Sequence, residues 1–276
     1  MRKFTPIAAA VALVSALSAV PAQADSFFWA INQFTTIQRL NGDTGAVVDT
    51  FAAPFLPGRA ASIAVVGNTG YYTILDDANV YKVDMTSHAY GGIAFSTGVA
   101  SRQNGITNDA NGHLWFAGGD SAPIREFNTA GTPLSSHAFP TAAGAYRDGS
   151  VVFGNFVVAN RGDQQGPYDK YNLTGGNLAL TVNQLSFIGA GFGSNGIAYN
   201  GTNFYTSDEQ AHEVSKWTSA GVFVSKAKLD QGSRYENWTF ASQDIVPDVP
   251  EPSTYALMFA GLALMGFAAK RKSRAA

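Results

Sequence analysis

The feature that most constrains the fold is a hairpin pattern that recurs five times along the chain. The copies read TTIQRLNGDTGAVVDTF, ANVYKVDMTSHAYGGIAF, APIREFNTAGTPLSSHAF, PYDKYNLTGGNLALTVNQL and HEVSKWTSAGVFVSKAKL. Each copy predicts a strand, a polar turn and a second strand. A charged residue followed by an apolar one marks every copy, and the apolar members stand 43, 44, 44 and 46 residues apart. These pairs are Arg39-Leu40, Lys82-Val83, Glu126-Phe127, Lys170-Tyr171 and Lys216-Trp217, of which only the third begins with an acidic residue.

A second repeated motif precedes four of the five hairpins. It reads ASIAVVGNTGYYTI, NGITNDANGHLWFAGG, DGSVVFGNFVVANR and NGIAYNGTNFYTSD, and each copy predicts an inner strand, a turn and a second strand. The first hairpin, at residues 27–51, has no such copy before it. The missing copy stands at the other end of the body, in ENWTFASQDIV at residues 236–246.

A period of about 40–45 residues with four strands per unit is typical of β-propellers. We therefore predict an all-β fold, a five-bladed β-propeller over residues 25–247, closed by N- and C-terminal strands in one blade. The C-terminal strand is expected to pair with SFFWAINQ, which leaves no unpaired edge in the circle. Four or six blades fit less well, because five hairpins tile the body without a gap. An open β-sandwich does not explain why the first and last segments complement each other.

The composition of the body excludes several kinds of site. The chain has no cysteine, so disulfides, thiolate metal sites and cysteine nucleophiles are excluded. Between the two basic ends, the body carries twelve positive and twenty negative charges, a net charge of −8. An acidic body argues against a nucleic-acid partner.

Oxygen-bearing residues recur just before the inner strands. In the five copies the residues at this position are Ala61, Asn104, Asp148, Asn195 and Glu236. Equivalent positions of a propeller lie in one ring around its axis, so four of the five could hold a hard cation such as Ca²⁺ or Mg²⁺. The alternative is structural, because Asn, Asp and Gly are favoured in tight turns before strands.

The repeats also resemble those of NHL-type and gluconolactonase-like propellers, in which NG(I/L)-A…DG…(L/Y)(Y/W)V(A/T)D recurs from blade to blade. The resemblance spreads loosely over residues 25–247. It implies a divalent metal bound by a Glu, an Asn and an Asp, and a lactonase or hydrolase activity. Asn195 matches that family's Asn-Gly element well and Asn104 stands where a substrate-contacting Asn is expected. Asp148 and Glu236 match by blade order only.

Other motifs fail on their context. GFGSNG at residues 191–196 has the spacing of a dinucleotide-binding loop but leads into a strand, so we interpret it as an inter-blade loop. NDANG at residues 108–112 resembles part of a calcium loop but lacks the downstream Glu. The four histidines show no paired metal spacing, and we expect His113 to point outward from a turn. Large aromatic residues are expected to pack between blades rather than to bind sugars; they are Trp115, Tyr205, Trp217 and Trp238.

The N-terminus has the three parts of a secretory signal peptide. Arg2 and Lys3 form the charged start, residues 7–20 the apolar stretch, and Ala22-Gln23-Ala24 the cleavage site. We expect the signal peptide to occupy residues 1–24, with cleavage between Ala24 and Asp25.

The C-terminus reads VPEPSTYALMFAGLALMGFAAKRKSRAA. Residues 254–269 carry no charge and predict a transmembrane helix of about 24 Å, slightly short of a hydrocarbon core of about 30 Å. A basic tail follows and places that end in the cytoplasm. Its charges are Lys270, Arg271, Lys272 and Arg274.

This C-terminus, residues 248–276, resembles the PEP-CTERM sorting signal of Gram-negative bacteria, with Pro250-Glu251-Pro252, an apolar helix and a basic tail in order. The resemblance implies recognition by an exosortase, processing near the Pro-Glu-Pro element, and a final place at the cell surface or in extracellular polymer. A permanent single-span anchor is the alternative.

Two functions follow as hypotheses. The first is a non-enzymatic surface propeller, transiently anchored in the inner membrane, that binds an exopolysaccharide or a surface protein. The second is a divalent-metal-dependent lactonase or hydrolase that uses the axial ring.

Overall fold

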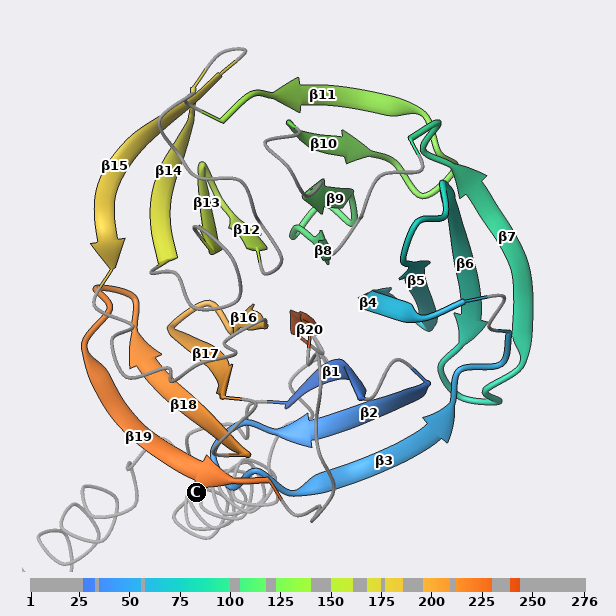
Figure 1. Ribbon diagram of the computed structural model, residues 1–276, viewed down its shortest axis with the longest axis horizontal. Helices are drawn as coiled ribbons and strands as arrows, with labels where there is room; N and C mark the ends of the chain where they lie inside the picture. Colours follow the sequence, from blue (N-terminus) through green and yellow to red (C-terminus); the bar gives the residue numbers. More distant parts are fainter. Residues whose placement is uncertain are drawn as a thin grey trace, which may run out of the picture. The chain divides into compact units, whose positions relative to one another are not determined.

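The computed structural model describes twenty strands that form five four-stranded antiparallel sheets arranged in a ring (Figure 1). The described residues are 27–32, 35–55, 58–99, 105–117, 123–139, 150–160, 168–174, 177–185, 196–208, 212–229 and 239–243. By internal contacts the chain divides into two units, and the ring occupies the unit Ser26–Ile245. The predicted five-bladed propeller is confirmed.

Each blade is described from its innermost to its outermost strand. Blade 1 consists of β20 (Thr239–Gln243), β1 (Phe27–Asn32), β2 (Thr36–Asn41) and β3 (Val47–Ala52). Blade 2 consists of β4 (Ala60–Val66), β5 (Thr69–Ile74), β6 (Asn79–Asp84) and β7 (Tyr90–Ser96). Blade 3 consists of β8 (Gly105–Asn108), β9 (Leu114–Ala117), β10 (Ile124–Phe127) and β11 (Pro133–His137). Blade 4 consists of β12 (Ser150–Phe153), β13 (Phe156–Asn160), β14 (Tyr168–Thr174) and β15 (Asn177–Leu185). Blade 5 consists of β16 (Ile197–Tyr199), β17 (Asn203–Asp208), β18 (Glu213–Thr218) and β19 (Phe223–Lys228).

The ring closes in blade 1, as the displaced repeat predicts. Strand β20 pairs with β1 in antiparallel register, with Phe28 opposite Gln243 and Ile31 opposite Thr239. In Figure 1, β20 lies near the centre of the ring together with the other innermost strands, and it contacts β4, β8 and β16. One sheet therefore joins the two ends of the body.

The core of the ring lies between blades rather than within one sheet. Five clusters of buried side chains fill the five junctions between neighbouring blades in the described part of the chain. Aromatic residues supply much of this packing: Tyr205 and Trp217 are fully buried, and Trp115 is nearly so. The expectation that these three aromatic residues pack in the core is confirmed, whereas Trp238 lies outside the described residues.

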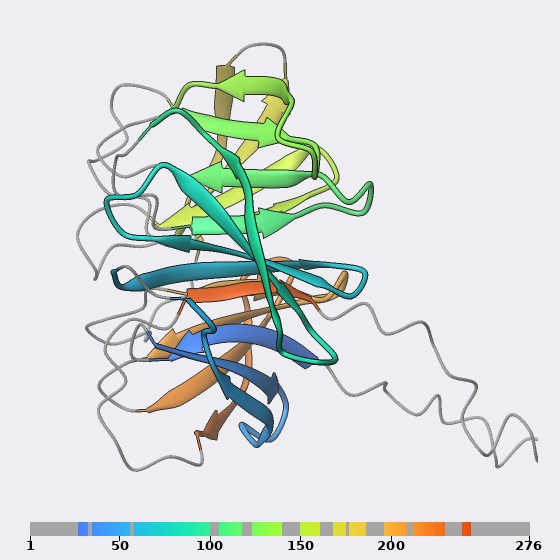
Figure 2. The same ribbon diagram turned by 90° about the vertical axis from the view of Figure 1, so that its right-hand side faces the viewer.

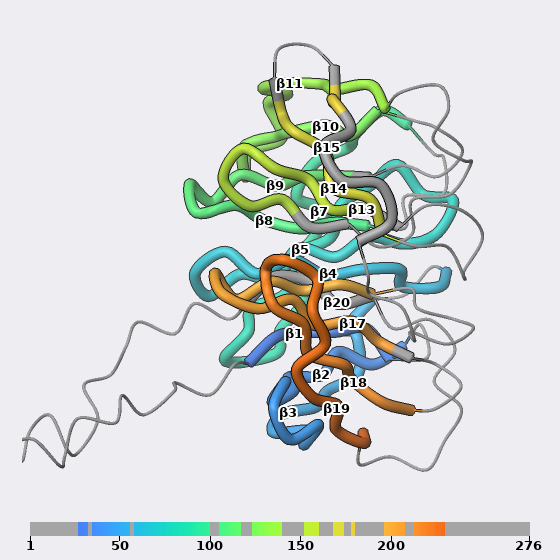
Figure 3. The backbone as a smooth tube through the Cα atoms, turned by 90° about the vertical axis from the view of Figure 1, so that its left-hand side faces the viewer, coloured from blue at the N-terminus to red at the C-terminus, as the bar shows by residue number. Residues whose placement is uncertain are grey.

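Successive strands of each blade run in opposite directions, so the connecting turns lie on two faces of the ring, which are visible in the edge-on views of Figure 2 and Figure 3. We call one of them the turn face. It carries the turns between the first and second strands of blades 2 to 5 and between the third and fourth strands of each blade. In blade 1 the end of β20 and the start of β1 take the place of the first turn. The described chain therefore enters and leaves the ring at the turn face.

The buried tyrosines give the ring a pH-dependent stability. Burial raises the pKa of Tyr81 to about 12. The Asp77 carboxylate, which accepts a hydrogen bond from the Tyr81 hydroxyl, adds to this effect. Burial also raises the pKa of Tyr71, Tyr72 and Tyr199. The folded state therefore holds these phenol protons to higher pH than the unfolded chain, whose tyrosines titrate near a pKa of about 10.

We expect the tyrosine contribution to the free energy of unfolding to be constant well below pH 10 and to fall between about pH 10 and 12, by roughly 1–3 kcal/mol for Tyr81 alone. Urea unfolding at stepped pH measures this. Tyr81→Phe keeps the ring but has no phenol proton to lose, so its stability should fall less steeply over the same interval. An unchanged slope in this variant would contradict the assignment.

Candidate functional site

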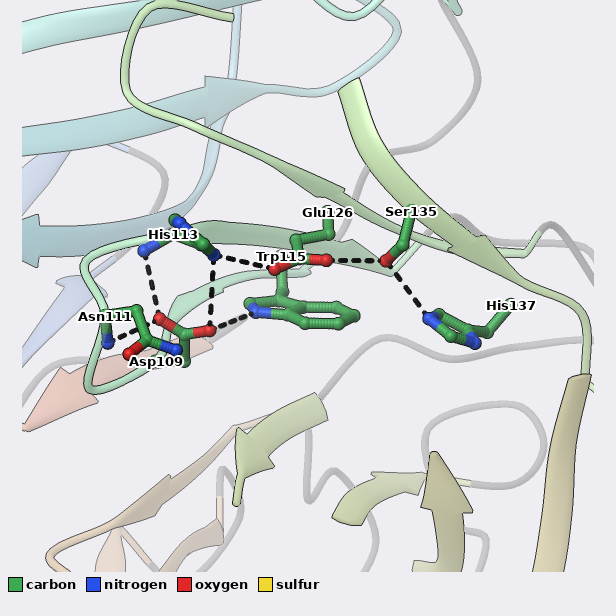
Figure 4. Close-up of polar contacts among 7 residues, drawn as sticks. All are labelled: Asp109, Asn111, His113, Trp115, Glu126, Ser135 and His137. Atoms are coloured by element: carbon green, nitrogen blue, oxygen red, sulfur yellow. Dashed lines mark hydrogen bonds and ion pairs between the residues drawn. The ribbon is translucent and has the colours of Figure 1, made fainter. Parts of the chain in front are cut away.

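Among the described residues, one cluster of three potential metal ligands lies in blade 3, around the turn between β8 and β9. Asp109, His113 and Glu126 offer ligand atoms that all lie within 4.8 Å of one another. Nδ1 of His113 lies 2.7 Å from Oε1 of Glu126 and 3.8 Å from Oδ2 of Asp109. We call these three residues the blade 3 cluster (Figure 4).

The local sequence builds the turn that holds this cluster. Oδ1 of Asp109 accepts the backbone N–H groups of Asn111, at 2.8 Å, and His113, at 3.0 Å. Such side-chain caps are the usual reason for Asp in turns. Gly112 has a φ of +76°, the left-handed conformation that glycine adopts without steric cost. The turn therefore places the His113 ring beside the third strand of its own blade.

Two further side chains position the carboxylates. Nε1 of Trp115 donates to Oδ2 of Asp109 at 3.1 Å, and the Trp115 ring itself is anchored in the core between blades 3 and 4. The Ser135 hydroxyl donates to Oε2 of Glu126 at 2.6 Å. Nε2 of His137 lies 3.0 Å from Oγ of Ser135 and extends the chain of hydrogen bonds along the outermost strand, β11, which carries both residues (Figure 4).

Blade 3 departs from the other blades at the two positions that create this cluster. Five residues separate the paired ends of its first two strands, whereas two residues do so in blades 2 and 4 and four in blade 5. The added length supplies His113. Glu126 occupies the strand position that is basic in every other repeat, where Lys216, for example, forms an ion pair with Asp43. Both departures bring an imidazole and a carboxylate together.

Sequence reasoning missed this cluster. Histidine pairing gives no signal for this cluster, because the partners of His113 are carboxylates. The NDANG loop itself contains no Glu, and the Glu that joins the cluster, Glu126, lies on a later strand. The expectation that His113 points outward is wrong for its Nδ1 atom, which faces Glu126, although the side chain is 33% exposed. The available signal was the reversed charge of Glu126 in the aligned repeats.

The arrangement around Ser135 does not fit a Ser-His-acid nucleophile. In such a triad the carboxylate orients the histidine, and the histidine takes the serine proton. Here Glu126 accepts the hydrogen bond of Ser135 itself, and Nδ1 of His137 is buried with no hydrogen-bond partner among the described residues. The geometry instead suits side chains that hold Glu126 in one orientation.

The predicted axial ring lies outside the described residues at all four of its oxygen-bearing positions, Asn104, Asp148, Asn195 and Glu236. The loop GFGSNG lies outside them except for Gly196. The axial metal site therefore stays a prediction. In the described part of the chain no helix has the length and hydropathy of a membrane span, and residues 254–269 lie outside that part.

The comparison with protein-family models matches residues 248–272 to the PEP-CTERM protein-sorting motif. The chain carries a PEP-CTERM sorting motif. The match includes Pro250-Glu251-Pro252 and the basic residues up to Lys272, and Arg274 lies just beyond it. The motif implies export, anchoring in the membrane before processing, and sorting by an exosortase to the surface. The predicted boundaries at residues 24 and 248, and cleavage after Ala24, stay predictions.

The structural comparisons show the fold. A chain of a nidogen/laminin complex is 11% identical, with a TM-score of 0.52 over 78% of this chain and 98% of that chain. A protein of unknown function from Bacteroides caccae is 14% identical, with a TM-score of 0.50 over 79% and 99%. Streptogramin B lyase is 16% identical, with a TM-score of 0.45 over 76% and 67%. No curated protein matches the chain by sequence.

Proposed function

We propose that this PEP-CTERM propeller is a binding module displayed on the surface or in the extracellular polymer of a Gram-negative bacterium. Its partner is an exopolysaccharide or a surface protein. The observation that carries the proposal is the pairing of β20 with β1, which lets both ends of the body leave the ring at the turn face. In this proposal the partner binds the face of the ring opposite the turn face, because both ends of the described ring lie at the turn face.

Display is tested by replacing Pro250, Glu251 and Pro252 with alanine in the full chain, in a host that has an exosortase. We expect the variant to remain in the inner-membrane fraction at its unprocessed mass, because the recognition element is lost. Protease accessibility on intact cells and mass spectrometry measure this. Replacing Asp244 and Pro247 with alanine is the matched control and should leave display intact, because both residues precede the matched motif. Equal display in a host without the exosortase would contradict the proposal.

Binding is tested separately from display. The exported protein is purified and sedimented with exopolysaccharide or with cell envelopes from the same host. Saturable co-sedimentation with either fraction supports the binding role, and the absence of both contradicts it.

The lactonase alternative rests on the axial ring and on a loose resemblance, and it stays a prediction. It requires calcium or magnesium binding that Asp148→Ala and Glu236→Ala abolish, together with hydrolysis of a lactone.

A further inference from the structure

We propose that Asp109, His113 and Glu126 form a binding site for a divalent transition metal, with Zn²⁺ as the best-fitting ion. This inference stands apart from the display function, because it depends only on side chains of blade 3. One imidazole nitrogen and two carboxylate oxygens are established ligand types for zinc.

The spacing of the three ligand atoms is close to that of a coordination shell. Zinc bonds of about 2.0–2.1 Å in tetrahedral geometry place neighbouring ligand atoms about 3.3–3.4 Å apart. The two distances from Nδ1 of His113, 2.7 Å to Glu126 and 3.8 Å to Asp109, lie on either side of that value. To bind the ion, the imidazole must give up the Nδ1 proton that it shares with Glu126, and the Nδ1–Oε1 distance must lengthen by about 0.6 Å.

The surrounding hydrogen bonds leave one oxygen of each carboxylate turned toward His113. Ser135 holds Oε2 of Glu126, so Oε1 faces the imidazole. The backbone of the turn holds Oδ1 of Asp109. Oδ2, the oxygen nearer to Nδ1 of His113, also accepts the indole N–H of Trp115. Partners of this kind orient metal ligands and tune their affinity.

Charge and ligand type favour zinc over calcium. Two carboxylates with a neutral imidazole bring two negative charges, which a divalent cation neutralises. Calcium takes about six to eight oxygen ligands, whereas this cluster supplies one nitrogen and, from each carboxylate, one oxygen near the imidazole. The side chains of Asp109 and Glu126 are 13% and 15% exposed and that of His113 is 33% exposed, so a fourth position can take water from the solvent side.

The test is isothermal titration of the exported full chain with ZnCl₂ after treatment with a chelator. We expect one zinc ion per chain. His113→Asn and Glu126→Gln should each weaken binding by more than the roughly 10- to 100-fold that is typical of losing an outer partner. His88→Asn is the matched control, because His88 lies in a turn of blade 2 at the same face, stacks on Phe51 and pairs with Asp49. This control should bind zinc as the unchanged chain does.

A graded variant separates a metal site from a structural hydrogen-bond network. Ser135→Ala leaves all three ligands in place but frees Oε2 of Glu126, so zinc affinity should fall about 10- to 100-fold while the stoichiometry stays the same. Circular dichroism and thermal melting in chelator establish whether each variant is folded. If His113→Asn is not folded, the conclusion rests on Glu126→Gln. The inference is overturned if the unchanged chain binds no zinc. It is also overturned if zinc binding survives both ligand variants, or if CaCl₂ binds the same site more tightly.

Discussion

A chain that ends at residue 238 is expected to remain unfolded, whereas a chain that ends at residue 247 folds as a closed ring. The two differ by nine residues that contain β20, and both lack the sorting motif. Without β20, the edge of β1 loses its partner at Ala30 and Ile31, both of which are fully buried in the closed ring.

The expected loss is comparable with the whole stability of the body. Each backbone hydrogen bond contributes about 1 kcal/mol, and apolar surface that returns to water costs about 25 cal/mol per Å². Because β20 also contacts the innermost strands β4, β8 and β16, its removal exposes apolar surface in several blades. Together these losses approach the roughly 5–15 kcal/mol that stabilise a typical domain.

Circular dichroism, size-exclusion chromatography and urea unfolding compare the two chains. The longer chain should show one cooperative transition and the shorter chain none. Rescue of the shorter chain by a synthetic peptide of residues 236–247 would strengthen the assignment. A cooperative transition in the shorter chain at the same urea concentration would show that β20 does not hold the ring closed.

Asp43→Asn is expected to lower the free energy of unfolding by about 2–4 kcal/mol. Asp43 accepts a 2.6 Å bond from Nζ of Lys216 and joins blade 1 to blade 5 at the closing junction. Burial by itself lowers the pKa of Lys216, but the hydrogen bond and charge of Asp43, with Tyr205, outweigh it and raise that pKa. The Lys216 side chain is only 9% exposed, so removing its partner leaves a charge that water reaches poorly.

The expected value overlaps the low end of the roughly 3–5 kcal/mol measured for fully buried pairs and extends below it, because Asp43 is 27% exposed. Urea unfolding measures it. The Lys226–Glu213 pair is the matched control: it has a similar N–O distance of 2.8 Å, but its lysine is 58% exposed. Glu213→Gln should therefore cost no more than about 1 kcal/mol. Adding Lys216→Met to Asp43→Asn should restore most of the lost stability, and equal losses in the two pairs would contradict the argument.

The blade architecture was predictable because short, contiguous stretches of sequence determine each strand and each turn. Each strand alternates or concentrates apolar residues over three to nine positions, and turns carry residues that cap their own backbone. Asn41, Asp84 and Asn128 illustrate this, since each accepts backbone N–H groups two to four residues further along. Repetition of such units also revealed the displaced copy that became β20.

The blade 3 cluster was harder to predict because two of its members come from the turn between β8 and β9 and the third comes from β10. His113 and Glu126 are 13 residues apart, and their contact depends on the register of β9 with β10. A one-residue change in that register would turn Glu126 to the other side of the sheet. The reversed charge at Glu126 pointed to the position, but the repeat pattern gave no sign of which residue would meet it.

The sequence by itself determined the number of blades, the strand that closes the ring and the sorting motif, because periodic patterns and contiguous motifs record these features directly. Only the tertiary structure decided which polar side chains meet, in the blade 3 cluster and in the Lys216–Asp43 pair, whose members are 173 residues apart. The physical reason is that a strand's pattern fixes which of its faces is buried, whereas a contact between side chains requires the twist, register and packing of strands that meet only once the ring is closed.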